Sequence, residues 1–213
     1  MQQRIIGITG GIATGKTTVS DYLHLKYGLP ILDADIYARQ ALTGDRLEQL
    51  RDRYGEQIFD YSNNAEGILD RQKLGAIIFA DANERKWLES LIHPYVKETL
   101  ISEAQKLAPA TVVMVIPLLF EAGMQNLVTE IWAIACDPKV QLQRLMQRNH
   151  LTKSEALQRI NSQKPQVEKL LLADAIIVNN QANYQTHRQA ADADDLLHLY
   201  SQIDQAFLAL TAK

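Results

Sequence analysis

The segment Gly10-Gly-Ile-Ala-Thr-Gly15-Lys16-Thr17 decides the fold of this chain. It fits the pattern G-x-x-x-x-G-K-[ST] at every fixed position. An apolar run at residues 4–8 precedes it, and a helical pattern at residues 16–25 follows it. A strand before the loop and a helix after it are the setting that this phosphate-binding loop, the P-loop, requires. The sequence therefore predicts a nucleotide-binding α/β domain.

The residue types of the loop match the chemistry of phosphate binding. Gly10, Gly11 and Gly15 allow the backbone to turn inward, so that successive N–H groups point at phosphate oxygens. Lys16 reaches the β- and γ-phosphates of a triphosphate, and the Thr17 hydroxyl is a ligand for Mg²⁺. We therefore expect ATP and Mg²⁺ as cofactors. The loop residues expected to bind the nucleotide are Gly10, Gly11, Ile12, Ala13, Thr14, Gly15, Lys16, Thr17 and Thr18.

Strands and helices alternate along most of the chain. Five short apolar runs are continuous rather than alternating, which is typical of strands that are covered on both faces. They lie at residues 4–8, 30–32, 112–116, 130–135 and 175–178. Helical patterns follow at residues 16–25, 36–42, 137–148 and 153–173. This order predicts a three-layer core with a five-stranded parallel sheet, in which the first strand is central.

Two intervals depart from that alternation. Residues 60–107 begin with a polar, turn-rich stretch and continue with helical spacing, so we interpret them as a helical insertion between the second and third strands. Residues 141–166 are polar and rich in Arg, Gln and Lys, and we interpret them as a lid. The predicted core is then residues 1–59 and 108–213, and an amphipathic helix from residue 189 closes it.

Composition excludes several classes of protein. The 213 residues suit one compact domain with a modest insertion, and a net charge of −3 provides no general attraction to nucleic acid. The single cysteine, Cys136, rules out an internal disulfide and is interpreted as a buried structural residue. The first residues do not have the pattern of a signal peptide. No apolar run in the sequence is long enough to cross a membrane. We expect a cytoplasmic protein that is a monomer or a small homo-oligomer, with no nucleic-acid or membrane partner.

Two carboxylates end the second strand, in Leu32-Asp33-Ala34-Asp35. A kinase needs a base for the acceptor hydroxyl and a partner for Mg²⁺ at this edge of the sheet. Asp35 is the candidate base and Asp33 the candidate metal partner. Asp35 alternatively serves as the N-cap of the following helix. The guanine-reading N-K-x-D motif is absent from the sequence, which argues against a GTPase switch.

Gln141, Arg144 and Arg148 follow at i, i+3 and i+7, so they share one face of a helix. Arginines supplied by a lid stabilise the charge of a phosphoryl group in transfer and exclude water. Arg144 and Arg148 are therefore candidate catalytic residues. A solvated charged face is the alternative interpretation.

The motifs together resemble the dephospho-CoA kinase family, from residue 4 to about residue 180. The resemblance rests on seven stretches taken in order: Thr9–Thr17, Asp33-Ala-Asp35 with Arg39, Leu69-Asp-Arg71, His93-Pro94, Pro117-Leu-Leu-Phe-Glu121, Gln141 with Arg144 and Arg148, and Ala173-Asp174 with Asn179-Asn180. It implies a nucleotide-binding core, a helical CoA-binding insertion and a lid. It also implies transfer of the ATP γ-phosphoryl group to the ribose 3′-hydroxyl of dephospho-CoA, the last step of CoA biosynthesis.

Site residues follow from the resemblance. Thr9 and Lys16 would line the phosphates, Asn179 would lie on the nucleotide, and Asp35 would be the base. Arg71, Phe79 and His93 would bind the acceptor, although His93 before Pro94 is also typical of a helix start.

The sequence departs from the family pattern at two positions. Ala13 replaces a glycine, which should be tolerated unless the position needs a positive φ. Gln181 stands where the family often has glycine. The rival functions are a kinase for another small hydroxyl compound or nucleotide and, from another class, a nucleotide-gated switch.

Overall fold

The computed structural model describes residues 3–62, 66–108, 110–180 and 190–211. The chain divides into two compact units. The first comprises Met1–Ala34 with Leu100–Lys213, and the second is Asp35–Thr99. The second unit begins earlier than residue 60, where the sequence suggested the start of the insertion, because the helices that follow Asp33 cluster with it.

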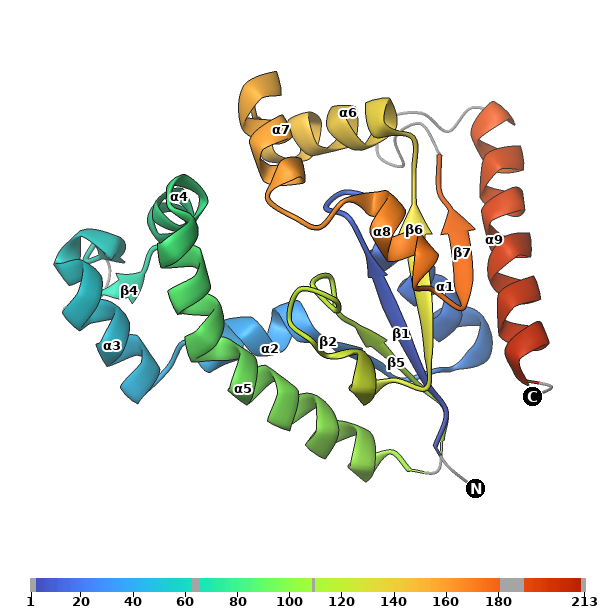
Figure 1. The fold of residues 1–213 in the computed structure, drawn as a ribbon, viewed down its shortest axis with the longest axis horizontal. Helices are drawn as coiled ribbons and strands as arrows, with labels where there is room; N and C mark the ends of the chain where they lie inside the picture. The colour runs from blue at the N-terminus through green and yellow to red at the C-terminus, as the bar shows by residue number, and fades with distance from the viewer. Residues whose placement is uncertain (1–2, 63–65, 109, 181–189, 212–213) are drawn as a thin grey trace. The chain divides into compact units, whose positions relative to one another are not determined.

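A parallel five-stranded sheet forms the centre of the first unit, which confirms the predicted fold class (Figure 1). Its strands are β1 (Ile5–Gly10), β2 (Ile31–Asp33), β5 (Val112–Val115), β6 (Glu130–Ala135) and β7 (Ala175–Val178). Their order is β2-β5-β1-β6-β7, and every pair is parallel. β1 is central as predicted, so the loop after it lies at the middle of the sheet's carboxyl edge.

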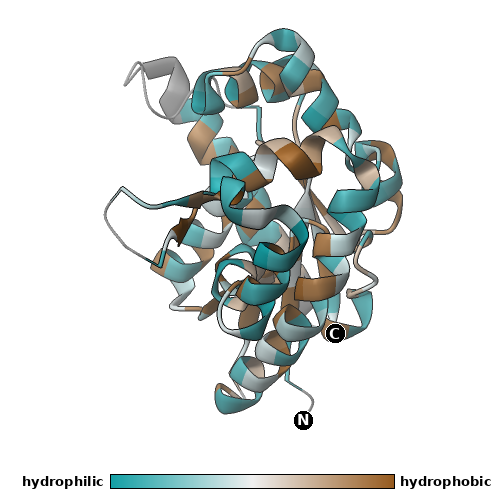
Figure 2. Ribbon diagram, turned by 90° about the vertical axis from the view of Figure 1, so that its left-hand side faces the viewer, coloured by the Kyte–Doolittle hydropathy of each residue, from teal (hydrophilic) through white to brown (hydrophobic). Residues whose placement is uncertain are grey.

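Helices cover the sheet on both faces. α1 (Lys16–Tyr27) and α9 (Ala190–Thr211) pack on one face, where Val19, Leu23, Leu199 and Ile203 join the strand residues of a buried core. α8 (Gln166–Leu171) contacts β1 and β6, and Figure 1 shows it in front of the sheet with α1 behind. Hydropathy colouring shows hydrophobic and hydrophilic residues mixed along the helices, as expected for elements with one buried face (Figure 2).

α9 also covers the open edge of the sheet. The side-chain amide of Gln202 accepts from the backbone N–H of Val178 at 2.9 Å and donates to its carbonyl at 3.1 Å. Unpaired backbone N–H and C=O groups of an edge strand can pair with other chains. The Gln202 amide occupies both of these groups at Val178. The closing helix predicted from residue 189 is therefore confirmed as a helix from Ala190 to Thr211.

The predicted helix at residues 153–173 is wrong as a single element. α6 (Pro138–Asn149) is followed by α7 (Lys153–Asn161), and α8 begins only at Gln166. Pro165 disfavours helical geometry at the residue before it, so the chain breaks between the two helices. Thr152 starts α7 with a capping box, in which its hydroxyl and the Glu155 carboxylate bond reciprocally to the backbone.

The second unit is mainly helical. It contains α2 (Ala34–Ala41), α3 (Asp45–Tyr54), α4 (Arg71–Ala80) and most of α5 (Ala82–Lys106). Its hydrophobic core cluster consists of Leu50, Ile58, Phe59, Leu74 and Leu88. The polar stretch from residue 60 is not only turn: β3 (Phe59–Asp60) and β4 (Ile68–Leu69) pair antiparallel across it. This unit also has a short 3₁₀ helix at Gly55–Ile58, and the first unit has another at Gln125–Leu127. No helix in the described part of the chain has the length and hydrophobicity of a membrane span.

Candidate active site

The P-loop connects β1 directly to α1, as the motif predicts. Gly10 has a φ of 148° and Gly15 a φ of 92°, conformations that other residues rarely adopt. Space is short as well: a Cβ on Gly10 would meet the carbonyl of Ile134, and one on Gly11 would lie 2.6 Å from Gln141 Nε2. Gly10 is therefore required both by the backbone turn and by a backbone neighbour, whereas at Gly11 only the flexible end of the Gln141 side chain limits the space.

Hydrogen bonds to the P-loop backbone fix the Lys16 side chain. Lys16 Nζ donates to the carbonyls of Gly10 at 3.0 Å and Gly11 at 2.9 Å, while Thr14 Oγ1 closes the turn on Gly11 at 2.9 Å. Thr17 is exposed in the first turn of α1, and that turn contains no acidic residue. The positive end of the helix is thus not neutralised by a carboxylate of its own first turn, which suits an anionic ligand.

Ala13 adopts a φ of 62°. The sequence predicted tolerance of alanine here unless a positive φ was needed, and the structure shows that it is needed. A left-handed conformation costs a residue with a Cβ about 1–2 kcal/mol. The loop therefore carries local backbone strain at the position where the family pattern has glycine.

Ala13→Gly should raise the free energy of unfolding by about 1 kcal/mol, because glycine adopts a positive φ without the clash of a Cβ. Urea denaturation would measure the change. The control is Ala206→Gly inside α9, where glycine should instead lower stability by about 1 kcal/mol. An Ala13→Gly protein no more stable than the parent would contradict the assignment of strain.

α6 brings two of its three predicted residues to the loop. Gln141 Nε2 donates to the Ile12 carbonyl at 2.9 Å, and Arg144 NH1 lies 3.4 Å from the carbonyls of Ala13 and Thr14. Arg148 is exposed and donates to Asn149 at 2.9 Å. For Gln141 and Arg144, the solvated-face interpretation is wrong, since Gln141 is buried and Arg144 is partly buried against the loop.

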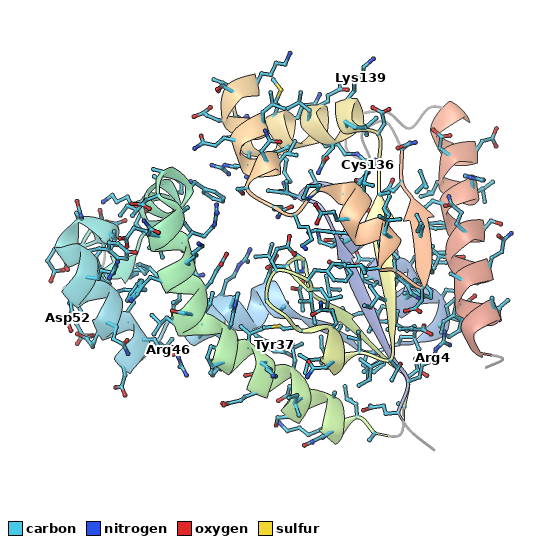
Figure 3. The ribbon with its side chains drawn as sticks, in the orientation of Figure 1. Arg4, Tyr37, Arg46, Asp52, Cys136 and Lys139 are labelled. Carbon is cyan, nitrogen blue, oxygen red and sulfur yellow. The ribbon has the colours of Figure 1, made fainter. Side chains whose placement is uncertain are left out.

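Burial lowers the pKa of the Arg144 guanidinium from its usual value, although arginine stays charged at any physiological pH. Cys136 lies nearby, at the end of β6 next to the start of α6 (Figure 3). Burial raises the pKa of its thiol, while the positive charges of Arg144 and Lys16 oppose that rise. A buried neutral thiol fits the structural role predicted for Cys136.

A buried lysine near the loop was missed by the sequence analysis. Lys169 on α8 has 1% of its side chain exposed, pairs with Glu121 at 2.8 Å, and lies 3.4 Å from the Pro117 carbonyl. The same carbonyl accepts from the hydroxyl of Thr9 at 3.2 Å. This network ties α8 and the segment after β5 to the residue that precedes the P-loop. Glu121 occurs in a motif quoted above, but nothing in the sequence indicated Lys169 as its partner.

A second missed residue is Gln163, between α7 and α8, whose Oε1 accepts from the N–H of Ile12 at 2.8 Å. Asn179, predicted to lie on the nucleotide, is buried at the end of β7, where its amide contacts Thr14 and Arg144. Gln181, the other departure from the family pattern, lies outside the described residues.

The two aspartates end up on different elements. Asp33 is the last residue of β2, and α2 begins at Ala34, so Asp35 is the second residue of that helix and is exposed. Asp35 therefore does not precede the helix as an N-cap would. Strand alternation also cannot relate the two side chains, because the strand ends between them. In the described residues, no cluster of three His, Cys, Asp or Glu side chains could hold a metal.

The predicted acceptor residues lie in the second unit. Arg71 is exposed at the start of α4 and donates to the Arg39 carbonyl at 3.3 Å, and Phe79 is half-buried near the end of that helix. His93 and Pro94 lie inside α5, so the prediction of a helix start there is wrong. Burial lowers the pKa of His93, against a smaller opposing effect of Glu89.

Acid should destabilise the protein through His93. Its pKa in the folded state is below the ordinary 6.5, so the unfolded chain binds more protons as pH falls through 6.5, and stability falls with it. His93→Gln should lose less free energy of unfolding than the parent between pH 7.5 and pH 5.5. Urea denaturation at the two pH values tests this, and equal losses would contradict it.

Comparisons with known proteins point to one family. A family model described as dephospho-CoA kinase matches residues 4–185. A dephospho-CoA kinase of Trichormus variabilis is 52% identical over 182 residues, which cover 84% of this chain and 91% of that protein. A crystal structure from Thermus thermophilus is 31% identical with a TM-score of 0.76 and covers 98% of both chains. A dephospho-CoA kinase structure from Campylobacter jejuni is 27% identical with a TM-score of 0.64, covering 96% of this chain and 97% of its own.

Proposed function

Because the chain belongs to the dephospho-CoA kinase family, we propose that it transfers the γ-phosphoryl group of ATP to the ribose 3′-hydroxyl of dephospho-CoA. The products are CoA and ADP, and the reaction is the last step of CoA biosynthesis. The observation that carries the proposal is the extent of the family match, because residues 4–185 include the P-loop, both aspartates and the arginines of α6.

Lys16 and the backbone N–H groups of the loop bind the phosphates of ATP in this proposal. The Lys16 ammonium exchanges its contacts with the Gly10 and Gly11 carbonyls for the β- and γ-phosphates. Arg144 lies beside the same loop and stabilises the charge on the transferring group. Arg148, one turn further along α6, is proposed to assist it when the lid closes.

Thr17 and Asp33 offer the hard oxygen ligands that Mg²⁺ prefers. Asp33 ends β2, and β5 separates that strand from β1, which leads through the P-loop to Thr17 in the first turn of α1. Thr17 would therefore bind the ion directly, and Asp33 would bind one of its waters. The ion would neutralise phosphate charge as the γ-phosphoryl group moves.

Asp35 is the proposed base that receives the proton of the ribose 3′-hydroxyl. It is exposed in the first turn of α2, where its charge is compatible with the positive end of that helix. The second unit, with Arg71, Phe79 and His93, is the proposed binding region for the rest of dephospho-CoA. A cytoplasmic location and a monomeric or small oligomeric state stay predictions from the sequence.

Release of ADP tests the function directly. The purified protein with ATP and Mg²⁺ should release ADP fastest with dephospho-CoA, compared with a panel of nucleosides and sugars at equal concentration. If another compound of the panel had a higher kcat/KM, that compound and not dephospho-CoA would be the acceptor. The assignment as an ATP-dependent kinase would still stand.

Amide exchange tests the role of the second unit. Dephospho-CoA without ATP should slow exchange around Phe79 and His93, because bound acceptor protects the backbone that it covers. Protection restricted to the P-loop would place the acceptor elsewhere.

A further inference from the structure

Asn179 directly follows β7, and both its backbone and its side chain form hydrogen bonds. Its backbone N–H donates to the Ala135 carbonyl at 2.8 Å, which continues the pairing of β7 with β6 by one residue. Only 3% of Asn179 is exposed. The residue is thus held rigidly by the sheet at the same edge as the P-loop.

The Asn179 amide joins two parts of the site. Its Nδ2 donates to the Thr14 carbonyl at 3.1 Å, and its Oδ1 accepts from Arg144 NH2 at 3.1 Å. Since a carbonyl only accepts and a guanidinium only donates, this pair of partners determines the orientation of the amide. An aspartate would satisfy the arginine but would turn a second acceptor toward the Thr14 carbonyl.

Gly15 shows how closely Asn179 approaches the loop. A Cβ built on Gly15 would collide with Asn179 Nδ2, so the last glycine of the motif leaves room for this amide as well as for its own turn. The contact of Arg144 NH2 with Asn179 Oδ1, at 3.1 Å, is shorter than the contacts of Arg144 NH1 with the carbonyls of Ala13 and Thr14, at 3.4 Å.

We propose that Asn179 is a positioning residue that holds the Arg144 guanidinium against the P-loop before the nucleotide arrives. The proposal rests on the role proposed above for Arg144. A free arginine side chain has about 2 kcal/mol of rotamer entropy, and a cation aligned in advance loses less of it during the reaction. The sequence indicated a nucleotide contact for Asn179; the buried amide instead acts through Arg144.

Asn179→Ala should lower kcat by about 10- to 100-fold, the loss expected when a catalytic group is misplaced. The KM for ATP should change less than about threefold, because the loop backbone still binds the phosphates. In an Arg144→Ala background, Asn179→Ala should have no further effect on kcat, since the group that it positions is gone. Asn179→Asp, of equal size, keeps an acceptor for Arg144 and loses only the donor to Thr14, so it should lower kcat less than the alanine variant does, and it serves if the alanine variant fails to fold.

Gln202→Ala is the matched control. It removes an amide with two backbone contacts to Val178, one residue before Asn179, and should lower stability without changing kcat. An undiminished kcat with a raised KM for ATP would overturn the proposal in favour of a nucleotide contact. An Asn179→Ala effect that persists in the Arg144→Ala background would overturn it as well. If Arg144→Ala alone left kcat normal while the parent remained active, both the role of Arg144 and this inference would fall and the kinase function would stand.

Discussion

Lys16→Ala should lower kcat by roughly 10²- to 10³-fold while the protein remains folded. The ammonium that neutralises the migrating phosphoryl group would be missing, and no backbone N–H carries a full charge in its place. The loss of two part-buried hydrogen bonds to the carbonyls of Gly10 and Gly11 should cost about 1–3 kcal/mol of stability. Single-turnover kinetics with ATP and dephospho-CoA, together with urea denaturation, would measure both quantities.

Lys106→Ala is the control for the loss of one positive charge. Lys106 is exposed at the end of α5, where it pairs with Glu103 at 2.6 Å. Exposed ion pairs of this kind contribute about 0–1 kcal/mol, and this variant should keep the parental kcat. A Lys16→Ala protein with near-normal turnover would remove the P-loop from the catalytic mechanism.

Asp35→Asn should lower kcat by roughly 10²- to 10⁴-fold, the contribution typical of a general base. Asparagine keeps the size and much of the hydrogen bonding of aspartate but cannot take the proton of the ribose hydroxyl. Binding of ATP and of dephospho-CoA, measured by calorimetry, should change little. The exposed first-turn charge of α2 is worth about 0.3–1 kcal/mol, so folding should persist.

Asp33→Asn is the matched variant, on the strand end two residues earlier. If Asp33 holds a Mg²⁺-bound water, loss of its carboxylate weakens the binding of the ion. Raising the Mg²⁺ concentration should then restore part of the rate. Asp35→Asn should show no such rescue. An active Asp35→Asn protein beside an inactive Asp33→Asn protein would exchange the two roles.

The order of elements around the P-loop could be predicted because its causes are local. Glycines with a positive φ, the run of β-branched residues before them and the helical periodicity after Lys16 all act within a few residues. The five strands, their parallel arrangement and the central place of β1 followed from the alternation of strand and helix patterns, whereas the order of the other four strands did not. The break between α7 and α8 was missed although Pro165 marked it, because the helical spacing on its two sides concealed it.

The sequence alone thus determined the family, the sheet, the P-loop and the face of α6 that carries Gln141 and Arg144. Only the tertiary structure decided what these side chains contact. Asn179 and Thr14 are 165 positions apart, and Gln163 and Ile12 are 151 apart, so no periodicity relates them. The positive φ of Ala13 is also visible only in the structure, because the residue type by itself favours a negative φ and the loop between β1 and α1 imposes the opposite sign.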